Sequence, residues 1–255
     1  MNHLPLYVGN HTILTKLSNG PRIFLDTRDP VCLEIAVTGL WEDHVTQVFL
    51  STVKNGMTVL DIGAHCGYYS MLAGMLVGQS GAVHAFEPNP FYHKNMLKSI
   101  GYNGFKDRVH LNRLAASNTR GEMKLRAFGE GGASIFFPGA ESLNGVTETT
   151  VPVGLISDYL PSLKVDVIKI DIDGGEPLIM DNLMQIINTN GSMTVFLEYC
   201  PLIYGGYPPE SVLRPFVETG FSFHNIQRNF EVKPTNADFL ADYGELEHID
   251  LMLVR

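Results

Sequence analysis

The sequence predicts an α/β fold in which a mostly parallel sheet of seven strands carries helices on both faces. Short apolar stretches alternate with amphipathic stretches of about ten residues from residue 57 onward. This alternation is typical of right-handed β-α-β units, which build parallel sheets. The chain has 255 residues, of which 45% are hydrophobic. It is therefore long enough to bury the large core that such a sheet requires.

The expected elements follow one another in order along the chain. Strands are predicted at residues 57–62, 82–86, 109–111, 165–170 and 193–197, each an apolar stretch bounded by turn residues. Helices are predicted at residues 42–54, 68–77, 89–100, 176–188 and 209–218, where apolar residues recur at helical spacing. Two further strands, 221–226 and 248–254, have no helix between them. They predict an antiparallel strand at the C-terminal edge of the sheet.

Residues 1–40 are predicted to form a β-rich N-terminal extension, and residues 41–255 form the main domain. Apolar stretches at residues 6–8, 12–14, 22–25 and 32–37 alternate with turn residues, so four short strands are expected. Their alternating apolar side chains must be buried, either against the main domain or against the second subunit of a homodimer.

Two other segments could cover a ligand. Periodicity fails between residues 128 and 150, which open with a glycine-rich stretch. Because long loops inside compact domains are usually functional, residues 129–150 are expected to lie over the ligand side of the sheet. Trp41 and Glu42 could form a flap over the same side, although Trp41 could equally anchor the core.

The charge and cysteine content disfavour several functions. The formal net charge is −9 at pH 7, and such a surface repels nucleic acid. The three cysteines form no C-x-x-C pair, which disfavours a zinc site and suits a reducing compartment. No signal-peptide pattern and no apolar stretch of membrane-spanning length is present. We therefore expect a cytoplasmic protein that acts on a small molecule, without a nucleic-acid or membrane partner.

A glycine turn after the first strand of the parallel series is the sharpest local motif, with the sequence D-I-G-A-H-C-G-Y at residues 61–68. Gly63 and Gly67 let the backbone bend and approach a ligand at a junction where open α/β sheets bind ligands. Their spacing differs from the G-x-G-x-x-G of dinucleotide-binding folds. Asp61 would repel a phosphate but attract an ammonium group, and Glu87 can accept ribose hydroxyls at the end of the next strand. S-adenosylmethionine (SAM), which carries no phosphate, is therefore the expected cofactor.

Four motifs resemble those of the FkbM family of class I methyltransferases. Residues 61–70 are similar to its D-I-G-A-x-x-G-x-Y-S motif, residues 86–90 to F-E-P-x-P, residues 114–121 to A-L-S-D-x-x-G, and residues 169–176 to K-I-D-V-E-G-x-E. The resemblance spans roughly residues 41–201. It implies a Rossmann-like fold and methyl transfer from SAM, usually to oxygen. His65 and Asp173 stand where the family usually has Asn and Glu.

The resemblance also implies which residues hold the cofactor. They are Asp61, Gly63, Ala64, His65, Gly67, Tyr68, Glu87, Pro88, Asn89, Ala115 and Asp171. The glycine turn would surround the methionine part, Glu87 the ribose, and Pro88 and Asn89 the adenine. Ala115 would lie under the ring, and Asp171 would face the methyl group from the end of a central strand.

A hydroxyl acceptor needs a base to remove its proton. The candidate bases are Asp171, Asp173, Glu176, Glu198, His65 and His224. Asp171, Asp173 and Glu198 are expected to be catalytic, because they follow neighbouring strands and their mutual repulsion should raise one pKa. Glu176 could instead cap the following helix. The same carboxylates could hold Mg²⁺, but no metal is expected, because the family resembled is not generally metal-dependent.

The predicted function is methyl transfer to a hydroxyl oxygen of a small molecule, such as a sugar or a specialised metabolite. Carboxyl or N-methyl transfer remains an alternative, as does a SAM-binding protein without catalysis. A nicotinamide oxidoreductase is disfavoured by the glycine spacing. Residues 207–209, Y-P-P, resemble in reversed order a motif of nucleobase methyltransferases, but proline at a helix start explains them.

Overall fold

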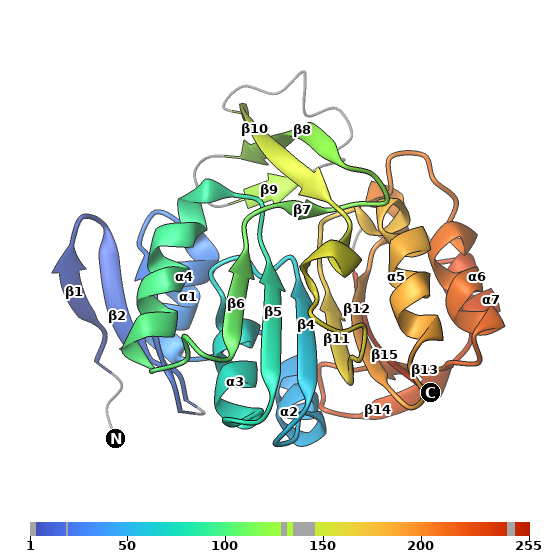
Figure 1. The fold of residues 1–255 in the computed structure, drawn as a ribbon, viewed down its shortest axis with the longest axis horizontal. Coiled ribbons are helices and arrows are strands. Elements are labelled where there is room, and N and C mark those ends of the chain that lie inside the picture. The colour runs from blue at the N-terminus through green and yellow to red at the C-terminus, as the bar shows by residue number, and fades with distance from the viewer. Residues whose placement is uncertain (1–3, 19, 129–131, 135–145, 244–247) are drawn as a thin grey trace.

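The computed structural model describes residues 4–18, 20–128, 132–134, 146–243 and 248–255. Its largest element is a sheet made of β4 (Thr58–Ile62), β5 (Ala82–Phe86), β6 (Val109–Asn112), β11 (Val167–Ile170), β12 (Thr194–Tyr199), β13 (Ser222–Ile226), β14 (Val232–Thr235) and β15 (Ile249–Val254). The strand order is β14-β13-β15-β12-β11-β4-β5-β6 (Figure 1). The predicted α/β class with a mostly parallel sheet is thereby confirmed.

The two ends of this sheet differ in strand direction. β12, β11, β4, β5 and β6 pair in parallel, as the β-α-β alternation predicted. The C-terminal strand β15 runs antiparallel to its neighbours, but it lies between β12 and β13 rather than at the edge. The edge is supplied by β14, an eighth strand that was not predicted. Pro234 lies within β14 and is tolerated there because an edge strand has one side without ladder partners.

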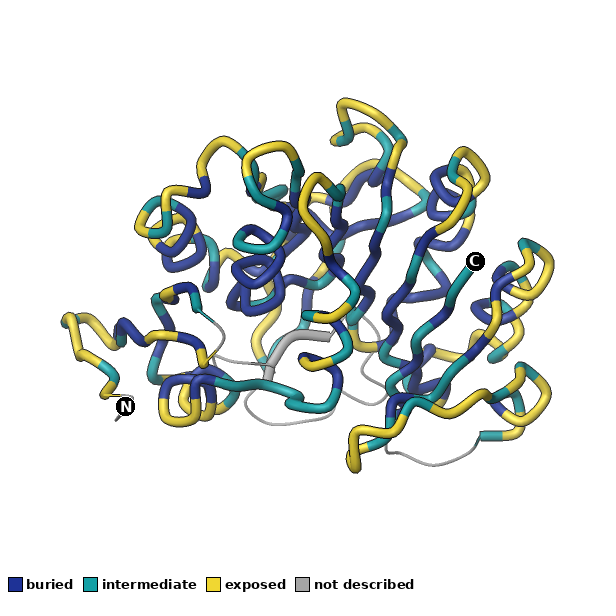
Figure 2. Tube along the Cα trace, turned by 90° about the horizontal axis from the view of Figure 1, so that it is seen from below, coloured by how far each residue is buried: buried dark blue, intermediate teal, exposed yellow. Residues whose placement is uncertain are grey.

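Helices cover both faces of the large sheet, as predicted. One core contains residues of α2 (Asp43–Thr52), α3 (Tyr68–Leu76) and α4 (Pro90–Tyr102), and the other contains residues of α5 (Met180–Asn188), α6 (Glu210–Glu218) and α7 (Ala237–Ala241). Val59 of β4 points into the first core and Leu60 into the second, as the two-residue period of a strand buried on both faces requires. The central strands are accordingly buried and the outer helix surfaces exposed (Figure 2). Among the described helices, none is long and apolar enough to cross a bilayer.

Within the described residues, short 3-10 turns interrupt the regular pattern at η2 (Ile156–Tyr159), η3 (Glu176–Leu178) and η4 (Pro201–Ile203). The predicted helix 176–188 is therefore divided into η3 and α5. Pro177 accounts for the division, because proline fits the first turn of a helix but lacks the N–H that continues one.

The N-terminal extension contains an antiparallel sheet of β1 (Leu6–Gly9), β2 (Thr12–Lys16) and β3 (Arg22–Asp26). The predicted strand 32–37 is wrong, because these residues belong to a helix, α1 (Pro30–Thr38). Asp29 caps this helix by accepting a hydrogen bond of 3.0 Å from the Cys32 N–H, and Gly39 ends it with a φ of 74°. These start and stop signals outweigh the apolar sequence between them.

The extension packs against the main domain, which is one of the two burial partners that the sequence left open. Ile23 and Leu25 are fully buried in the same core as α3 and α4. The outer edge of β3 faces α4, where the Phe24 N–H donates to the Ser99 hydroxyl at 2.9 Å. A side chain of α4 thus satisfies an edge donor that a further strand would otherwise pair with.

A small sheet lies over the carboxyl ends of the parallel strands (Figure 1). It contains β7 (Ala115–Ala116), β8 (Gly121–Phe128), β9 (Gly132–Ser134) and β10 (Val146–Gly154), in the order β7-β10-β8-β9. The predicted loop 129–150 is therefore wrong for residues 132–134 and 146–150, which both pair antiparallel with β8. Residues 146–150 carry no apolar alternation because residues 147–150 are exposed. Residues 129–131 and 135–145 of that loop lie outside the described residues.

Candidate active site

A cavity of about 280 Å³ lies at the carboxyl ends of β4, β5, β11 and β12, next to the small sheet. Most of the predicted site residues line it: Asp61, Gly63, Ala64, His65, Tyr68, Glu87, Pro88, Ala115, Asp171, Asp173 and Glu198. Gly67 and Asn89 do not line it. Each is instead the residue that caps the start of a helix. Gly67 precedes α3, and the Asn89 side chain caps α4 by accepting from the Phe91 N–H at 3.0 Å. Val31 and Ile35 of α1 also line the cavity, so the extension forms part of its wall.

The glycine turn is held tightly between β5 and β11. The N–H groups of Gly63 and Ala64 both donate to the Phe86 carbonyl, at 2.9 and 3.0 Å. Gly63 has a φ of 87°, and a Cβ built on it would lie 1.7 Å from the Asp171 carbonyl oxygen. Only glycine therefore fits this position, both for its left-handed backbone and for its contact with β11.

Two buried carboxylates flank the turn. Glu87 accepts one hydrogen bond of 2.7 Å from the His65 N–H and another of 2.7 Å from the Asn89 N–H, one on each oxygen. Asp61 accepts from the Ser70 hydroxyl. Burial raises the pKa of Glu87 to about 7 and that of Asp61 to about 6. A cationic ligand in the cavity would stabilise the ionised form of both groups.

The His65 side chain is bound to the N-terminal extension. Its Nε2 atom lies 2.8 Å from Asp29 Oδ2, and the Tyr92 hydroxyl donates to the same oxygen at 2.7 Å. Burial disfavours the charged imidazole, but the neighbouring Cys66 thiol and the Asp29 carboxylate raise the pKa of His65 well above its usual value. Asp29 and Tyr92 were not predicted as site residues, because the sequence Asp29-Pro30 was interpreted only as a turn.

Lys169 brings a positive charge to the acidic end of the cavity. It is 5% exposed, and its Nζ atom lies 2.7 Å from Asp171 Oδ2 and 4.6 Å from the centre of the Tyr69 ring. Burial opposes ionisation of Asp171, but the Lys169 charge keeps the pKa of Asp171 below its usual value. Lys169 was identified from the sequence only as part of the K-I-D motif and not as a site residue. The sequence feature that could have identified Lys169 is its position as the single charged residue of a fully buried strand, because a buried lysine needs a charged partner.

Two further carboxyl groups beside Asp171 differ in protonation. Burial and the charge of Asp171 raise the pKa of Glu198 well above its usual value. In the hydrogen bond between the two groups, Glu198 is the donor and Asp171 the acceptor, which raises the pKa of Glu198 and lowers that of Asp171. Burial and the Asp171 charge also raise the pKa of Asp173, to about 7. Asp173 adopts a left-handed φ of 50°, a strained backbone that functional sites often contain.

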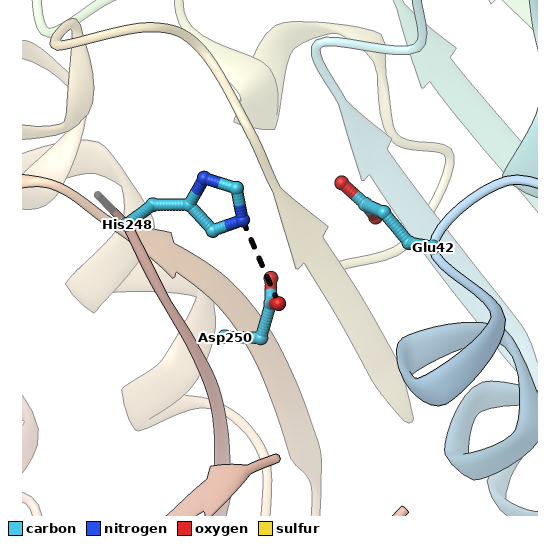
Figure 3. Close-up of side chains that lie close together, drawn as sticks. All are labelled: Glu42, His248 and Asp250. Atoms are coloured by element: carbon cyan, nitrogen blue, oxygen red, sulfur yellow. Dashed lines mark ion pairs between the residues drawn. The ribbon is translucent and has the colours of Figure 1, made fainter. Parts of the chain in front are cut away.

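Glu42 forms the opposite wall of the acidic end. It precedes α2 with a φ of 42°, lines the cavity and accepts a hydrogen bond of 2.9 Å from the Tyr69 hydroxyl. His248 and Asp250 face it from the C-terminal part of the chain (Figure 3). One ligand atom from each of these three residues lies within 4.8 Å of the others, and the same holds for Glu42, Asp171 and Glu198. The set of acids that could surround a cation thus differs from the predicted one, since it contains Glu42.

Glu176 and His224, two of the candidate bases, do not line the cavity. Glu176 is 2% exposed, and its carboxylate accepts from the Ile172 N–H at 3.2 Å, within its own loop. His224 lies in β13, at the far side of the sheet. Asp171, Asp173, Glu198 and His65 remain as candidate bases at the cavity.

Comparison with known proteins agrees with this architecture. A family model described as the methyltransferase FkbM domain matches residues 61–226. The structure of P. horikoshii TYW2 in complex with MeSAdo is similar with a TM-score of 0.52 and 14% identity, over 100% of this chain and 76% of that one. M. jannaschii TYW2 in complex with AdoMet has a TM-score of 0.52 and 12% identity, over 98% and 87% of the two chains.

At these identities the structural likeness concerns the fold alone. No curated protein matches the sequence. The family match is stronger, because it covers well over half of the chain and contains the glycine turn, the acid that ends the second strand, and the K-I-D motif. This chain therefore belongs to the FkbM family of SAM-dependent methyltransferases.

Proposed function

We propose that the cavity binds SAM and that the protein transfers the methyl group to a hydroxyl oxygen of a small molecule, such as a sugar or a specialised metabolite. The observation that carries this proposal is the pair of buried carboxylates, Asp61 and Glu87, beside one glycine turn. Two carboxylates repel a pyrophosphate, but they attract an ammonium group and accept hydroxyl hydrogens. A phosphate-free cationic nucleoside fits these requirements.

Within this proposal each wall of the cavity has a separate task. Glu87 accepts the ribose hydroxyls with the acceptor capacity that its two backbone donors leave free. Asp61 faces the methionine ammonium group, and Ala115 lies against the adenine. The acidic end around Asp171 then surrounds the acceptor. SAM supplies the electrophilic methyl group, and the protein aligns it with the acceptor oxygen, a positioning effect worth up to about 7–11 kcal/mol.

We assign the role of general base to Asp173. A hydroxyl becomes a good nucleophile as its proton leaves, and a base is most effective when its pKa lies near the working pH. Asp173 meets this condition with a pKa of about 7. Asp171 is a weaker base because Lys169 stabilises its ionised form, and Glu198 is engaged as the hydrogen-bond donor to Asp171. Asp171 and Glu198 would therefore orient the acceptor.

The cofactor assignment is tested by titration calorimetry with S-adenosylhomocysteine and with NAD. We expect S-adenosylhomocysteine to bind and NAD to give no heat of binding, because its pyrophosphate would meet Asp61 and Glu87. Binding of NAD alone would overturn the assignment.

The acceptor assignment is tested with SAM carrying a labelled methyl group and a panel of hydroxyl, amine and carboxylate compounds. We expect transfer to hydroxyl compounds. Asp173→Asn should lower kcat and remove the acidic limb of the pH profile, which is the loss of activity below about pH 7 as Asp173 becomes protonated. Asp173→Glu, the residue usual in the family, should restore activity. Transfer only to amines or carboxylates would replace the hydroxyl assignment, and binding without any transfer would favour a catalytically silent protein.

We further propose that the protein works in the cytoplasm and without a metal. Its net charge of −9 supports the further proposal that nucleic acid is not a partner. Loss of activity in a chelator, with recovery in Mg²⁺, would instead assign a cation to the acids around Glu42. A homodimer also remains a proposal, since Leu6 and Tyr7 of β1 are exposed apolar residues. Sedimentation of the full chain tests it.

A further inference from the structure

Two cysteines that lie far apart in the sequence meet beside the cofactor cavity. Cys66 belongs to the glycine turn and lines the cavity, and Cys32 lies in the first turn of α1. Both are free thiols, 4% and 1% exposed, and they lie close enough for each to shift the pKa of the other. The third cysteine, Cys200, follows β12 and does not line the cavity.

One carboxylate holds the two cysteine-bearing segments together. Asp29 Oδ1 accepts from the Cys32 N–H at 3.0 Å, while Asp29 Oδ2 lies 2.8 Å from Nε2 of His65, the residue before Cys66. Tyr92 adds a third bond, of 2.7 Å, to this carboxylate. The contact between the thiols is therefore built into the junction between the extension and the glycine turn.

The surroundings also make the two thiols chemically different. The interaction with Cys32 and the neighbouring His65 imidazole together lower the pKa of Cys66 to about 6 despite burial. The interaction with Cys66 raises the pKa of Cys32, as does its burial. Cys66 is thus a thiolate at neutral pH and Cys32 keeps its proton. This is the arrangement of a reactive cysteine with a resolving partner.

We propose that Cys66 and Cys32 are an oxidisable pair, which closes to a disulfide when a hydroperoxide enters the cofactor cavity. In the first step the Cys66 sulfur forms a bond to the terminal peroxide oxygen, the O–O bond breaks, and the leaving oxygen takes a proton. In the second step the Cys32 sulfur attacks the Cys66 sulfenic acid, and the sulfenic oxygen leaves as water with the Cys32 proton. Two thiols thereby lose two electrons, and hydrogen peroxide is reduced to two waters.

The disulfide would act on the cofactor site through the glycine turn. Cys66 follows His65, whose N–H binds Glu87, and both residues line the cavity. A covalent bond to α1 changes the thiol contact and draws the turn toward the extension. We therefore expect oxidised protein to bind S-adenosylhomocysteine at least about tenfold more weakly than reduced protein. Conversely, a ligand that fills the cavity shields Cys66 and slows its oxidation.

The full-length reduced protein is treated with stoichiometric hydrogen peroxide, and its thiols are titrated. We expect the number of thiols to fall from three to one, the intact mass to fall by two hydrogens, and the peptide map to contain a Cys32–Cys66 link that dithiothreitol reverses. Cys200→Ser is the matched control and should form the same link. Cys32→Ser should form no link but should expose a Cys66 sulfenic acid to dimedone.

Several outcomes overturn the proposal. These are retention of all three thiols, a link that includes Cys200, or oxidation of Cys32→Ser without a dimedone adduct on Cys66. Equal oxidation rates with and without saturating S-adenosylhomocysteine would refute the route through the cavity, and equal affinities of the oxidised and reduced forms would refute the effect on the cofactor site. Because thiol titration needs no cofactor, a failure of the proposed SAM binding is recognised separately.

Discussion

Replacing Gly63 with alanine tests whether the glycine turn is shaped by its contact with β11. The new Cβ would lie 1.7 Å from the Asp171 carbonyl oxygen and 2.9 Å from Ile172 Cγ2. Both distances are shorter than van der Waals contact, and the carbonyl is backbone, so it cannot rotate away. The ends of β4 and β11 must therefore separate, which also weakens the 3.0 Å hydrogen bond from the Asp171 N–H to the Ile62 carbonyl.

The expected loss of stability in Gly63→Ala is the sum of two contributions. A left-handed backbone costs an L-residue about 1–2 kcal/mol relative to glycine. Forcing extra volume into a packed site costs about 1–3 kcal/mol more. We therefore expect Gly63→Ala to lower the free energy of unfolding by about 2–5 kcal/mol. The affinity for S-adenosylhomocysteine should fall at least about tenfold, because the displaced turn and Asp171 both line the cavity.

Gly104→Ala is the matched control. Gly104 also has a positive φ, of 67°, but its Cβ would meet no atom within 4 Å. This variant should lose only the backbone contribution of about 1–2 kcal/mol and should bind the ligand normally. Urea unfolding followed by circular dichroism measures the stabilities, and calorimetry measures the affinities. Equal destabilisation of the two variants would refute the reasoning.

Three further predictions concern the charged groups of the cavity. Glu87→Gln should weaken S-adenosylhomocysteine binding by about ten- to a hundredfold in calorimetry, because a hydrogen bond to a charged acceptor contributes about 1.5–3 kcal/mol. Glu218→Gln, at an exposed position, is the control. Equal affinities of the two variants would contradict the role of Glu87. The affinity for S-adenosylhomocysteine should also fall below pH 7, and binding there should release protons. Glu87 and Asp61, with pKa values of about 7 and 6, are protonated in the acidic range and must ionise to bind a cationic group. An affinity that rises on acidification would contradict this. Asp171→Asn should abolish turnover, while the affinity for S-adenosylhomocysteine changes less than about tenfold. It should also lower the free energy of unfolding by about 3 kcal/mol, because it leaves Lys169 buried without its carboxylate. Retained turnover would refute the role of Asp171.

The sheet could be predicted because its signals are local. The strand before the glycine turn, TVLDI, is mostly apolar, and the following helix begins at Tyr68 as expected. Where local signals were weak or mixed, prediction failed. Residues 32–37 are apolar enough for a strand, yet the capping side chain of Asp29 and the terminal Gly39 make them a helix. β14 contains a proline and only half-buried or exposed residues, so it lacked the alternation that marks a strand.

Some residues of the candidate site could likewise be predicted from local sequence signals, and others could not. Asp61, Gly63 and Glu87 could be identified because each stands at a strand end, and parallel strands bring these ends to one edge of the sheet. Lys169 was missed as a site residue because a motif alone does not reveal which way a strand residue points. Asp250 was missed because β15 had been placed at the sheet edge, whereas its position beside β12 brings the residue opposite Glu42 (Figure 3).

The sequence by itself determined the alternation of strands and helices, the glycine bend and the positions of the acids along the chain, since periodicity and turn chemistry act between near neighbours. Only the tertiary structure decided the pairings across the cavity: His65 with Asp29, Cys66 with Cys32, and Glu42 opposite His248. These partners are separated by tens to hundreds of residues. Their meeting depends on how whole elements pack, and the protonation of each group depends on the burial and the charges that this packing creates.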